Sequence, residues 1–508
     1  MALAAATAGG AASAAEAPAP LSVIDWLSDS VRAPAVAPAP PHAPGPLPSA
    51  EGGAVTSATL DAPRPDAAGL LAPEVAGLSA TLWAGSGTGR IAALIARQRA
   101  DAPPAVLALL NRVLLAALEP PVDSGPDGAL LLARVDKLLD LGALEPARAL
   151  LEQAGPNRPE SFRRWFDVSL LTGHEARACA TMRATPDIAP RLAARVFCLA
   201  RAGDWNSAVL TMETGAALGR IPPDEADLLA RFLDADLAEE GDPKIPTRMT
   251  PLTFRILEAI GLPQPTGALP LAFAHADLAP RAGWKAQLEA AERLARSSAL
   301  APSVLFDLYA AGSPAASGGV WDRVAAVQAL DVALLAGDAP LAATKLAHAR
   351  AAMAMAGLEI AFSVQYGARL RRLVQATGPA PLLAYRAALL GGLAPDPEAA
   401  PGGDATARWL ALLARGAPLP PPPAVAGELA QAVHAGLGGA LPDASPAARL
   451  LAEGLRGEAL LEALLRLGAR AAVDPQDTAA ALGVLEALGL GVEARRIGLE
   501  LLLLDGRG

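Results

Sequence analysis

The chain has 508 residues, of which 52% are hydrophobic and only 4% aromatic, and its formal net charge is −10 at pH 7. Its apolar residues are mostly Ala, Leu and Val, which favour close helix packing over sheets, so we expect an all-α fold. The net negative charge argues against a nucleic-acid partner. No uncharged apolar run reaches the roughly 18–20 residues of a spanning helix, so we expect no transmembrane span.

Residues 1–32 combine a small-residue stretch with a short apolar motif. An Ala-Ser-Ala sequence at residues 12–14 is typical of a signal-peptidase site, although no Lys or Arg stands in front of it. We favour export to the periplasm; the alternatives are a disordered Ala-rich tail and a true start that lies upstream. The motif that follows, PLSVIDWLSDSV, contains Ile24, Trp26 and Leu27. It is interpreted either as a docking motif for a partner or, as we favour, as a segment that folds back onto its own chain.

Residues 33–73 are rich in Pro and Ala. Proline recurs at short intervals, as in VRAPAVAPAPPHAPGPLP, which predicts an extended, polyproline-like linker rather than part of a core. A PxxP-type ligand role is the alternative, and the lack of basic anchors beside the prolines argues against it.

Residues 74–392 are expected to form an α-solenoid, because the sequence pattern of a helical hairpin occurs three times between residues 128 and 215. Gly142, Gly173 and Gly203 lie 31 and 30 residues apart, and an Ala follows each of them five residues later. Before the first and third glycines, apolar residues at offsets of 11, 7 and 4 make one helical face. The glycine ends the first helix without a Cβ penalty, and the small Ala lets the second helix pack closely.

The segment GDWNSAV, at residues 203–209, resembles the turn and second-helix start of a tetratricopeptide repeat. GALEPARAL at Gly142 and GHEARACA at Gly173 match more loosely, and Gly337 and Gly489 repeat the Gly–Ala spacing. The units are shorter than the usual repeat of about 34 residues. The resemblance implies a degenerate TPR-like α-solenoid of stacked hairpins, whose concave surface binds a protein or peptide.

Two further segments complete the chain. Residues 393–426 are rich in Pro and Gly and predict a second linker region, interrupted by the short stretch RWLALLAR. Residues 427–508 return to a helical pattern and are expected to form a C-terminal helical domain or cap.

The residue types that carry chemistry indicate no catalytic or metal site. The five histidines are isolated, and the sequence has no HExxH motif, GxSxG nucleophile elbow, dinucleotide fingerprint or P-loop. Acid pairs at 224–225 and 239–240 suit a glycan-cleaving enzyme, but adjacent acids on a helix point in different directions. Cys179 and Cys198 are either bridged or two small core residues. We therefore expect no catalytic residue, metal or cofactor.

We expect a non-enzymatic protein–protein interaction scaffold or adaptor that binds a protein or peptide. Candidate partner contacts lie near the repeat faces, with Trp165 equally interpretable as a core residue, and in the N-terminal motif: Arg163, Arg164, Trp165, Trp205, Ile24, Trp26 and Leu27. The alternative is an exported all-α enzyme that acts on cell-wall polymer or polysaccharide.

Overall fold

The computed structural model describes residues 64–234, 236–237, 243–442, 445–468 and 474–504. In this part of the chain, 24 α-helices pack against their neighbours without strands, which confirms the all-α fold. None of these helices is both long enough and apolar enough to cross a membrane. The N-terminal motif and most of the first linker lie outside the described residues.

The three predicted hairpins are present. Their helices are α5 (Ala129–Asp140) with α6 (Leu144–Ala154), α7 (Pro159–Thr172) with α8 (Glu175–Ala184), and α9 (Leu192–Arg201) with α10 (Trp205–Ala217). The turn glycines Gly142, Gly173 and Gly203 have φ values of 76°, 77° and 84°, a region that glycine enters without a steric penalty. The alanines five residues later are fully buried: Ala147, Ala178 and Ala208.

The two more distant turns of the same pattern also separate helices. Gly337, with φ of 70°, lies between α16 (Val320–Ala336) and α17 (Ala339–Met355). Gly489, with φ of 82°, lies between α24 (Pro475–Ala487) and α25 (Gly491–Leu504). The Gly–Ala spacing therefore predicts helical turns well outside the regular stretch.

A disulfide joins the second and third hairpins. It links Cys179 of α8 to Cys198 of α9, with their Cα atoms 5.1 Å apart and both side chains buried. Of the two interpretations of these cysteines, the structure has the bridged one.

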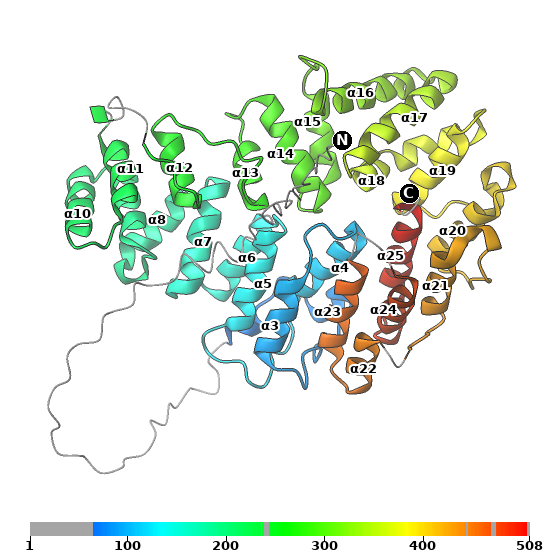
Figure 1. Cartoon of the computed structure of the whole chain (residues 1–508), viewed down its shortest axis with the longest axis horizontal. Coiled ribbons are helices and arrows are strands. Elements are labelled where there is room, and N and C mark those ends of the chain that lie inside the picture. The colour runs from blue at the N-terminus through cyan, green and yellow to red at the C-terminus, as the bar shows by residue number, and fades with distance from the viewer. Residues whose placement is uncertain (1–63, 235, 238–242, 443–444, 469–473, 505–508) are drawn as a thin grey trace, which may run out of the picture.

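The path of the chain divides the helices into an arm and a ring (Figure 1). After α7, the hairpin helices α8, α9 and α10 lead outward, and α11 (Pro223–Leu233) begins the return. The next helix, α12 (Pro251–Ala259), packs back on α7, where Arg255 Nε donates to the carbonyl of Leu170 at 2.7 Å. Helices α8–α11 thus form the arm, and the chain rejoins the ring beside the helix from which it left.

The ring has two halves (Figure 1). One half holds α12, α13 (Ala274–Asp277) and the helices that follow them in the chain: α14 (Trp284–Arg296), α15 (Pro302–Ala310), α16, α17, α18 (Glu359–Leu370) and α19 (Ala380–Leu390). The other half holds the two ends of the described chain: α3 (Thr88–Arg97), α4 (Pro104–Leu115), α5, α6, α7, α20 (Ala405–Arg415), α21 (Gly427–Leu437), α22 (Pro446–Ala452), α23 (Arg456–Leu467), α24 and α25. The halves meet where α12 and α13 contact α7, and where α19 contacts α25.

Helices from the two ends of the chain close the ring. α23 packs on α3 and α25 packs on α4, and one hydrophobic cluster contains core residues of both ends. Gln98 Nε2 donates to the carbonyl of Leu461 at 2.8 Å, and Arg90 forms an ion pair with Glu458. Gly457 lies against Trp83 so closely that a Cβ would come within 2.4 Å of the indole ring. The solenoid is therefore closed rather than open-ended.

The stretch from 393 to 426, predicted as a linker region, contributes a packed helix. Its apolar sequence RWLALLAR belongs to α20, in which Trp409, Leu410 and Leu413 are buried. α20 contacts both α19 and α25, while the prolines and all three glycines of the stretch lie in the connections on either side of it. The described residues from 427 onward form α21–α25, which pack against one another, and α23 and α25 also pack against α3 and α4.

Candidate functional site

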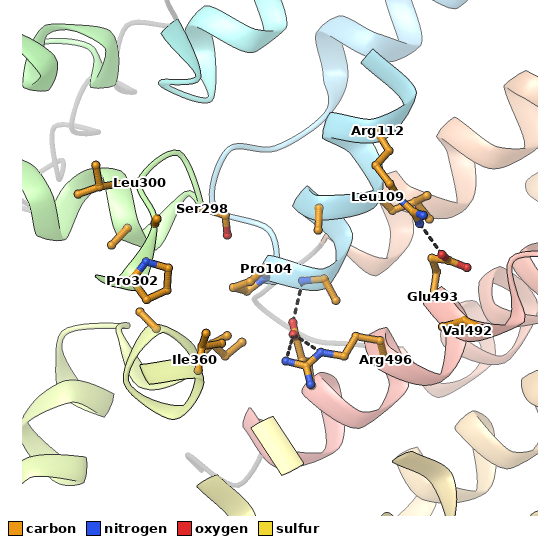
Figure 2. Close-up of a pocket in the computed structure, with 17 residues that line it drawn as sticks. Pro104, Leu109, Arg112, Ser298, Leu300, Pro302, Ile360, Val492, Glu493 and Arg496 are labelled. Atoms are coloured by element: carbon orange, nitrogen blue, oxygen red, sulfur yellow. Dashed lines mark hydrogen bonds and ion pairs between the residues drawn. The ribbon is translucent and has the colours of Figure 1, made fainter. Parts of the chain in front are cut away.

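The central pocket is a cavity of about 560 Å³ at which segments distant in sequence come together (Figure 2). Its walls are α4, the α14–α15 connection with the start of α15, the start of α18, and α25. Each wall belongs to the ring, and two of them, α4 and α25, are also the helices that close it. The pocket thus depends on the closed arrangement.

Most of the pocket lining is apolar. The large apolar side chains are Leu109, Leu300, Pro302, Ile360, Val364 and Val492. Val364 is 48% exposed and Val492 is 74% exposed, so apolar surface faces solvent here without a partner in the described chain. Sites for ligands are typically concave and mainly apolar, with a few convergent polar groups.

Two arginine–glutamate pairs supply the charged groups of the pocket (Figure 2). Arg112 Nη2 lies 2.6 Å from Glu493 Oε1, which joins α4 to α25. Arg496 Nε donates to Glu500 Oε1 at 3.0 Å within α25. Both carboxylates are therefore held by a guanidinium.

Glu500 also satisfies the first turn of α4. That helix begins with Pro104 and has no capping side chain of its own, so the Ala105 N–H, which lacks a partner within the helix, donates to Glu500 Oε2 at 2.8 Å. A carboxylate at a helix N-terminus is also favoured by the helix dipole. Glu500 is only 1% exposed, and burial raises the pKa of its carboxyl group, an effect that Arg496 and the Ala105 N–H oppose.

Arg496 ties the same turn of α25 to the end of α19. It donates to the carbonyl of Leu389 at 3.0 Å and also to the carbonyl of Leu390. These carbonyls belong to the last turn of α19, where a cation is favoured. One turn of α25 therefore fixes the N-terminus of α4 relative to the C-terminus of α19.

Ser298, which lines the pocket, has an unusual backbone conformation. Among the described residues it is the one non-glycine residue with positive φ, at 61°. Its side chain is exposed, and it stands in the connection between α14 and α15. Such conformations are sparsely populated, and they concentrate at ligand sites and switch regions.

A second cavity of about 320 Å³ adjoins the central pocket and shares Val492 and Arg496 with it. Its described lining contains three arginines, Arg415, Arg495 and Arg496, and no carboxylate. The two cavities together present an apolar surface that continues into a cationic one.

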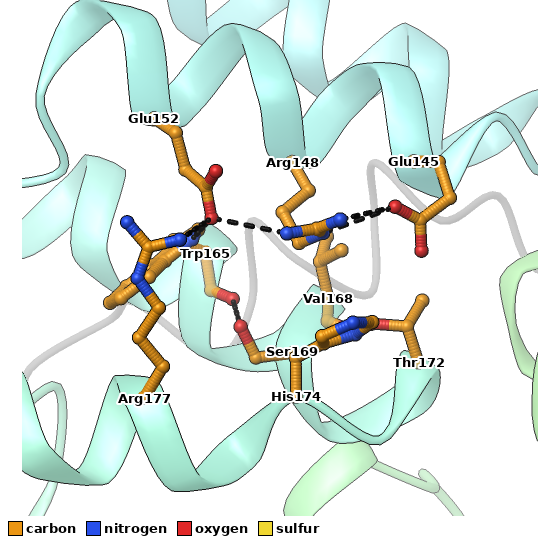
Figure 3. A network of polar contacts seen from close by, with 9 residues as sticks. All are labelled: Glu145, Arg148, Glu152, Trp165, Val168, Ser169, Thr172, His174 and Arg177. Carbon is orange, nitrogen blue, oxygen red and sulfur yellow. Dashed lines mark hydrogen bonds and ion pairs between the residues drawn. The ribbon is translucent and has the colours of Figure 1, made fainter.

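Arg164 and Trp165, two of the predicted contacts, lie on α7 and take part in contacts between the hairpins. Arg164 forms a two-pronged ion pair with Asp136 of α5, at 2.5 and 2.7 Å. Trp165 is buried, and its Nε1 donates to Glu152 Oε1 at 3.1 Å. In Figure 3, Glu152 also accepts from Arg148 and Arg177, and the Arg177 guanidinium stands 5.8 Å from the centre of the Trp165 ring. This arrangement fits the core interpretation of Trp165.

Arg163, another predicted contact, is buried beside an acid. With Asp167 and Arg191 it lines a small cavity of about 20 Å³ between α7, the start of α9 and α12. Burial raises the pKa of Asp167 to about 6, although the nearby positive charges of Arg163, Arg191 and Arg164 oppose the rise. Burial also lowers the pKa of Arg163.

Trp205, in contrast, is 49% exposed at the start of α10, at the end of the arm. It lies on the same helix as the exposed Leu210, and Leu218 follows at the helix end. The other predicted contacts, Ile24, Trp26 and Leu27, lie outside the described residues. None of the predicted contacts that the structure describes lines the central pocket.

The sequence does not predict the pocket, because its walls come from four separate segments, around residues 104–112, 295–302, 360–364 and 492–500. No segment alone carries a motif. The local signals that were available were the Pro103–Pro104 helix start and the i,i+4 spacing of Arg496 and Glu500, and neither says what it will contact.

No known protein family, curated protein or solved structure matches this chain. Within the described ranges, no group of three or more His, Cys, Asp or Glu residues is arranged to hold a metal ion.

Proposed function

We propose that this protein is a non-enzymatic, TPR-like scaffold that binds an apolar segment of a protein partner in the central pocket. The observation that carries the proposal is the pocket itself, where apolar side chains from four ring segments line one cavity and Val364 and Val492 stand exposed. Helical solenoids commonly bind proteins and peptides on such inner surfaces.

The polar groups of the pocket also suit binding better than catalysis. Glu493 and Glu500 are both paired with arginines, and Glu500 is enclosed beneath α4. Cleavage of a polysaccharide by two carboxyl groups requires both to reach the scissile bond. We therefore favour the scaffold over an exported enzyme that acts on cell-wall polymer.

Export is a separate part of the proposal. Disulfides form and persist in oxidising compartments and are rare in reducing ones. The buried Cys179–Cys198 bridge supports an extracytoplasmic location such as the periplasm.

Crosslinking from inside the pocket tests the proposed function. A photo-reactive amino acid is placed at Val364 or Val492, both of which are exposed and should tolerate substitution, and at Val332 of α16 as the matched control. Val332 is 65% exposed and is not part of the pocket lining. In the native host, we expect both pocket positions to capture the same protein through an apolar segment, identified by mass spectrometry. Equal capture from all three positions, or capture from none, would contradict the proposal.

A further inference from the structure

We propose that, when no partner is bound, the central pocket is occupied by the chain's own N-terminal segment, residues 21–31, which a partner must displace. The inference rests on the proposed function, because it assumes that the pocket accepts an apolar peptide. It adds that the N-terminal segment competes with the partner for the pocket, so that partner binding is regulated by the chain itself.

The first argument is the chemistry of the segment, LSVIDWLSDSV. Val23, Trp26 and Leu27 are spaced i, i+3, i+4, which in a helix places them on one face. Full burial of such a side chain is worth about 1.5–3 kcal/mol, and the Pro- and Ala-rich sequence that follows offers nothing to cover it. The described chain offers the complementary surface in the apolar walls of the pocket.

The second argument is where the tether is anchored. Residues 64–71 are held against α4 and α5: the Leu70 N–H donates to the Leu115 carbonyl at 2.7 Å, and Arg134 donates to the Ala68 carbonyl at 2.7 Å. The anchor thus lies at the C-terminal end of α4, and the pocket begins at the N-terminal end of the same helix. A helix of 12 residues is about 18 Å long.

Residues 32–63 connect the segment to this anchor. A Pro-rich chain extends about 3.1 Å per residue and can therefore reach roughly 100 Å, several times the length of α4. A tether that can span the two sites raises the effective concentration of the segment to the order of millimolar. Even a weak intrinsic affinity then suffices for occupancy.

The third argument is charge. Residues 21–31 contain Asp25 and Asp29 and no Lys or Arg. The cavity that adjoins the pocket presents Arg415 and Arg495. An acidic, apolar segment therefore matches the combined surface in both respects, and a basic one would not.

The test uses the purified full-length chain alone. A photo-reactive amino acid is placed at Leu27, with Leu47 in the Pro-rich stretch as the matched control. We expect position 27 to crosslink within its own chain to peptides of α4, α18 or α25, with a yield independent of protein concentration, and position 47 not to do so. Val364→Asp and Val492→Asp should each lower that yield at least fivefold, whereas Val332→Asp should leave it unchanged.

Three results would overturn the inference: crosslinks to another surface such as the arm, crosslinks only between two chains, and crosslinks insensitive to Val364→Asp. Failure of the inference is distinguishable from failure of the proposed function. If the purified chain shows no self-crosslink but pocket positions capture a partner in the host, only the inference fails. If the self-crosslink is present and no partner is captured even with Leu27→Asp, which releases the segment, the proposed function fails.

Discussion

Single charged side chains join helices to one another in this molecule. Arg134 is buried in α5, where it donates to the carbonyls of Leu114 and Ala116 at the end of α4 and to that of Ala68. Burial lowers its pKa to about 10, so it stays charged at neutral pH. Glu500 performs the opposite role, accepting from the N–H at the start of α4. Both ends of one helix are thus completed by side chains from other helices.

Asp167 gives a prediction about pH. Its pKa is raised to about 6, so the folded protein binds this proton more tightly than the unfolded chain does. The stabilisation is complete below the ordinary pKa of 3.8 and is lost as pH rises through about 6. Relative to Asp167→Asn, the wild type should therefore lose about 1–3 kcal/mol of unfolding free energy between pH 4 and pH 7. Urea denaturation at several pH values measures the difference.

The control for this titration is Asp187→Asn, which removes an exposed carboxylate from the connection between α8 and α9. If the unfolding free energies of wild type and Asp167→Asn differ by the same amount at every pH, burial does not raise the pKa of Asp167.

At the scale of the element, the turns at Gly142 and Gly173 share the same Gly–Ala spacing but have different surroundings. Gly142 and Gly173 end their helices with φ of 76° and 77°. A Cβ on Gly142 would lie 2.9 Å from Leu294 and 3.0 Å from Leu271, whereas one on Gly173 would meet nothing within 4 Å. The carbonyl of Gly142 also accepts from His275 Nε2 at 2.6 Å. The first turn is therefore a contact between the two halves of the ring as well as a turn.

Alanine at these two glycines should separate backbone strain from packing. Gly173→Ala should cost about 1 kcal/mol, from the left-handed conformation alone. Gly142→Ala should cost a further 1–3 kcal/mol or so, because Leu294 and Leu271 must move. The free energies of unfolding from chemical denaturation give both values. Equal losses of unfolding free energy in the two variants would mean that Leu294 and Leu271 make room for the new methyl group at no energetic cost.

These elements also show what the sequence can and cannot predict. The turns at Gly142, Gly173 and Gly203 are local, because a glycine, a small residue and a helical face suffice to specify them. The outcome at Trp165 is not local, because an aromatic residue near a repeat face is equally compatible with a surface contact and with the hydrogen bond to Glu152 that it makes. The pocket is the extreme case, since its walls meet only after residues near 104 and 500 have been brought together.

At the scale of the whole molecule, ring closure makes distant helices depend on one another. In an open stack each repeat touches only its neighbours, so a terminal helix can loosen alone. Here α23 packs on α3, and α25 packs on α4. The amides of helices near the two ends of the described chain should therefore become more or less protected from hydrogen exchange together.

Gly457→Ala tests this coupling, because its Cβ would lie 2.4 Å from the Trp83 ring and 2.8 Å from the Leu82 carbonyl. We expect a loss of about 1–3 kcal/mol and faster amide hydrogen exchange in α3 as well as in α23. Gly89→Ala in α3 is the matched control, since a Cβ there meets nothing within 4 Å and alanine favours a helix. Faster exchange confined to α23 would show that the ends are not coupled.

A closed ring also constrains how such a protein can change in evolution. An open solenoid can gain or lose a hairpin and simply become longer or shorter, whereas an extra hairpin within the ring would move α25 away from α4 and open the pocket between them. Helices α8–α11 are exempt, because the chain leaves and rejoins the ring at neighbouring helices, α7 and α12. Duplication and deletion of repeats should therefore be tolerated in the arm, while the number of helices in the ring stays fixed among descendants that keep the pocket.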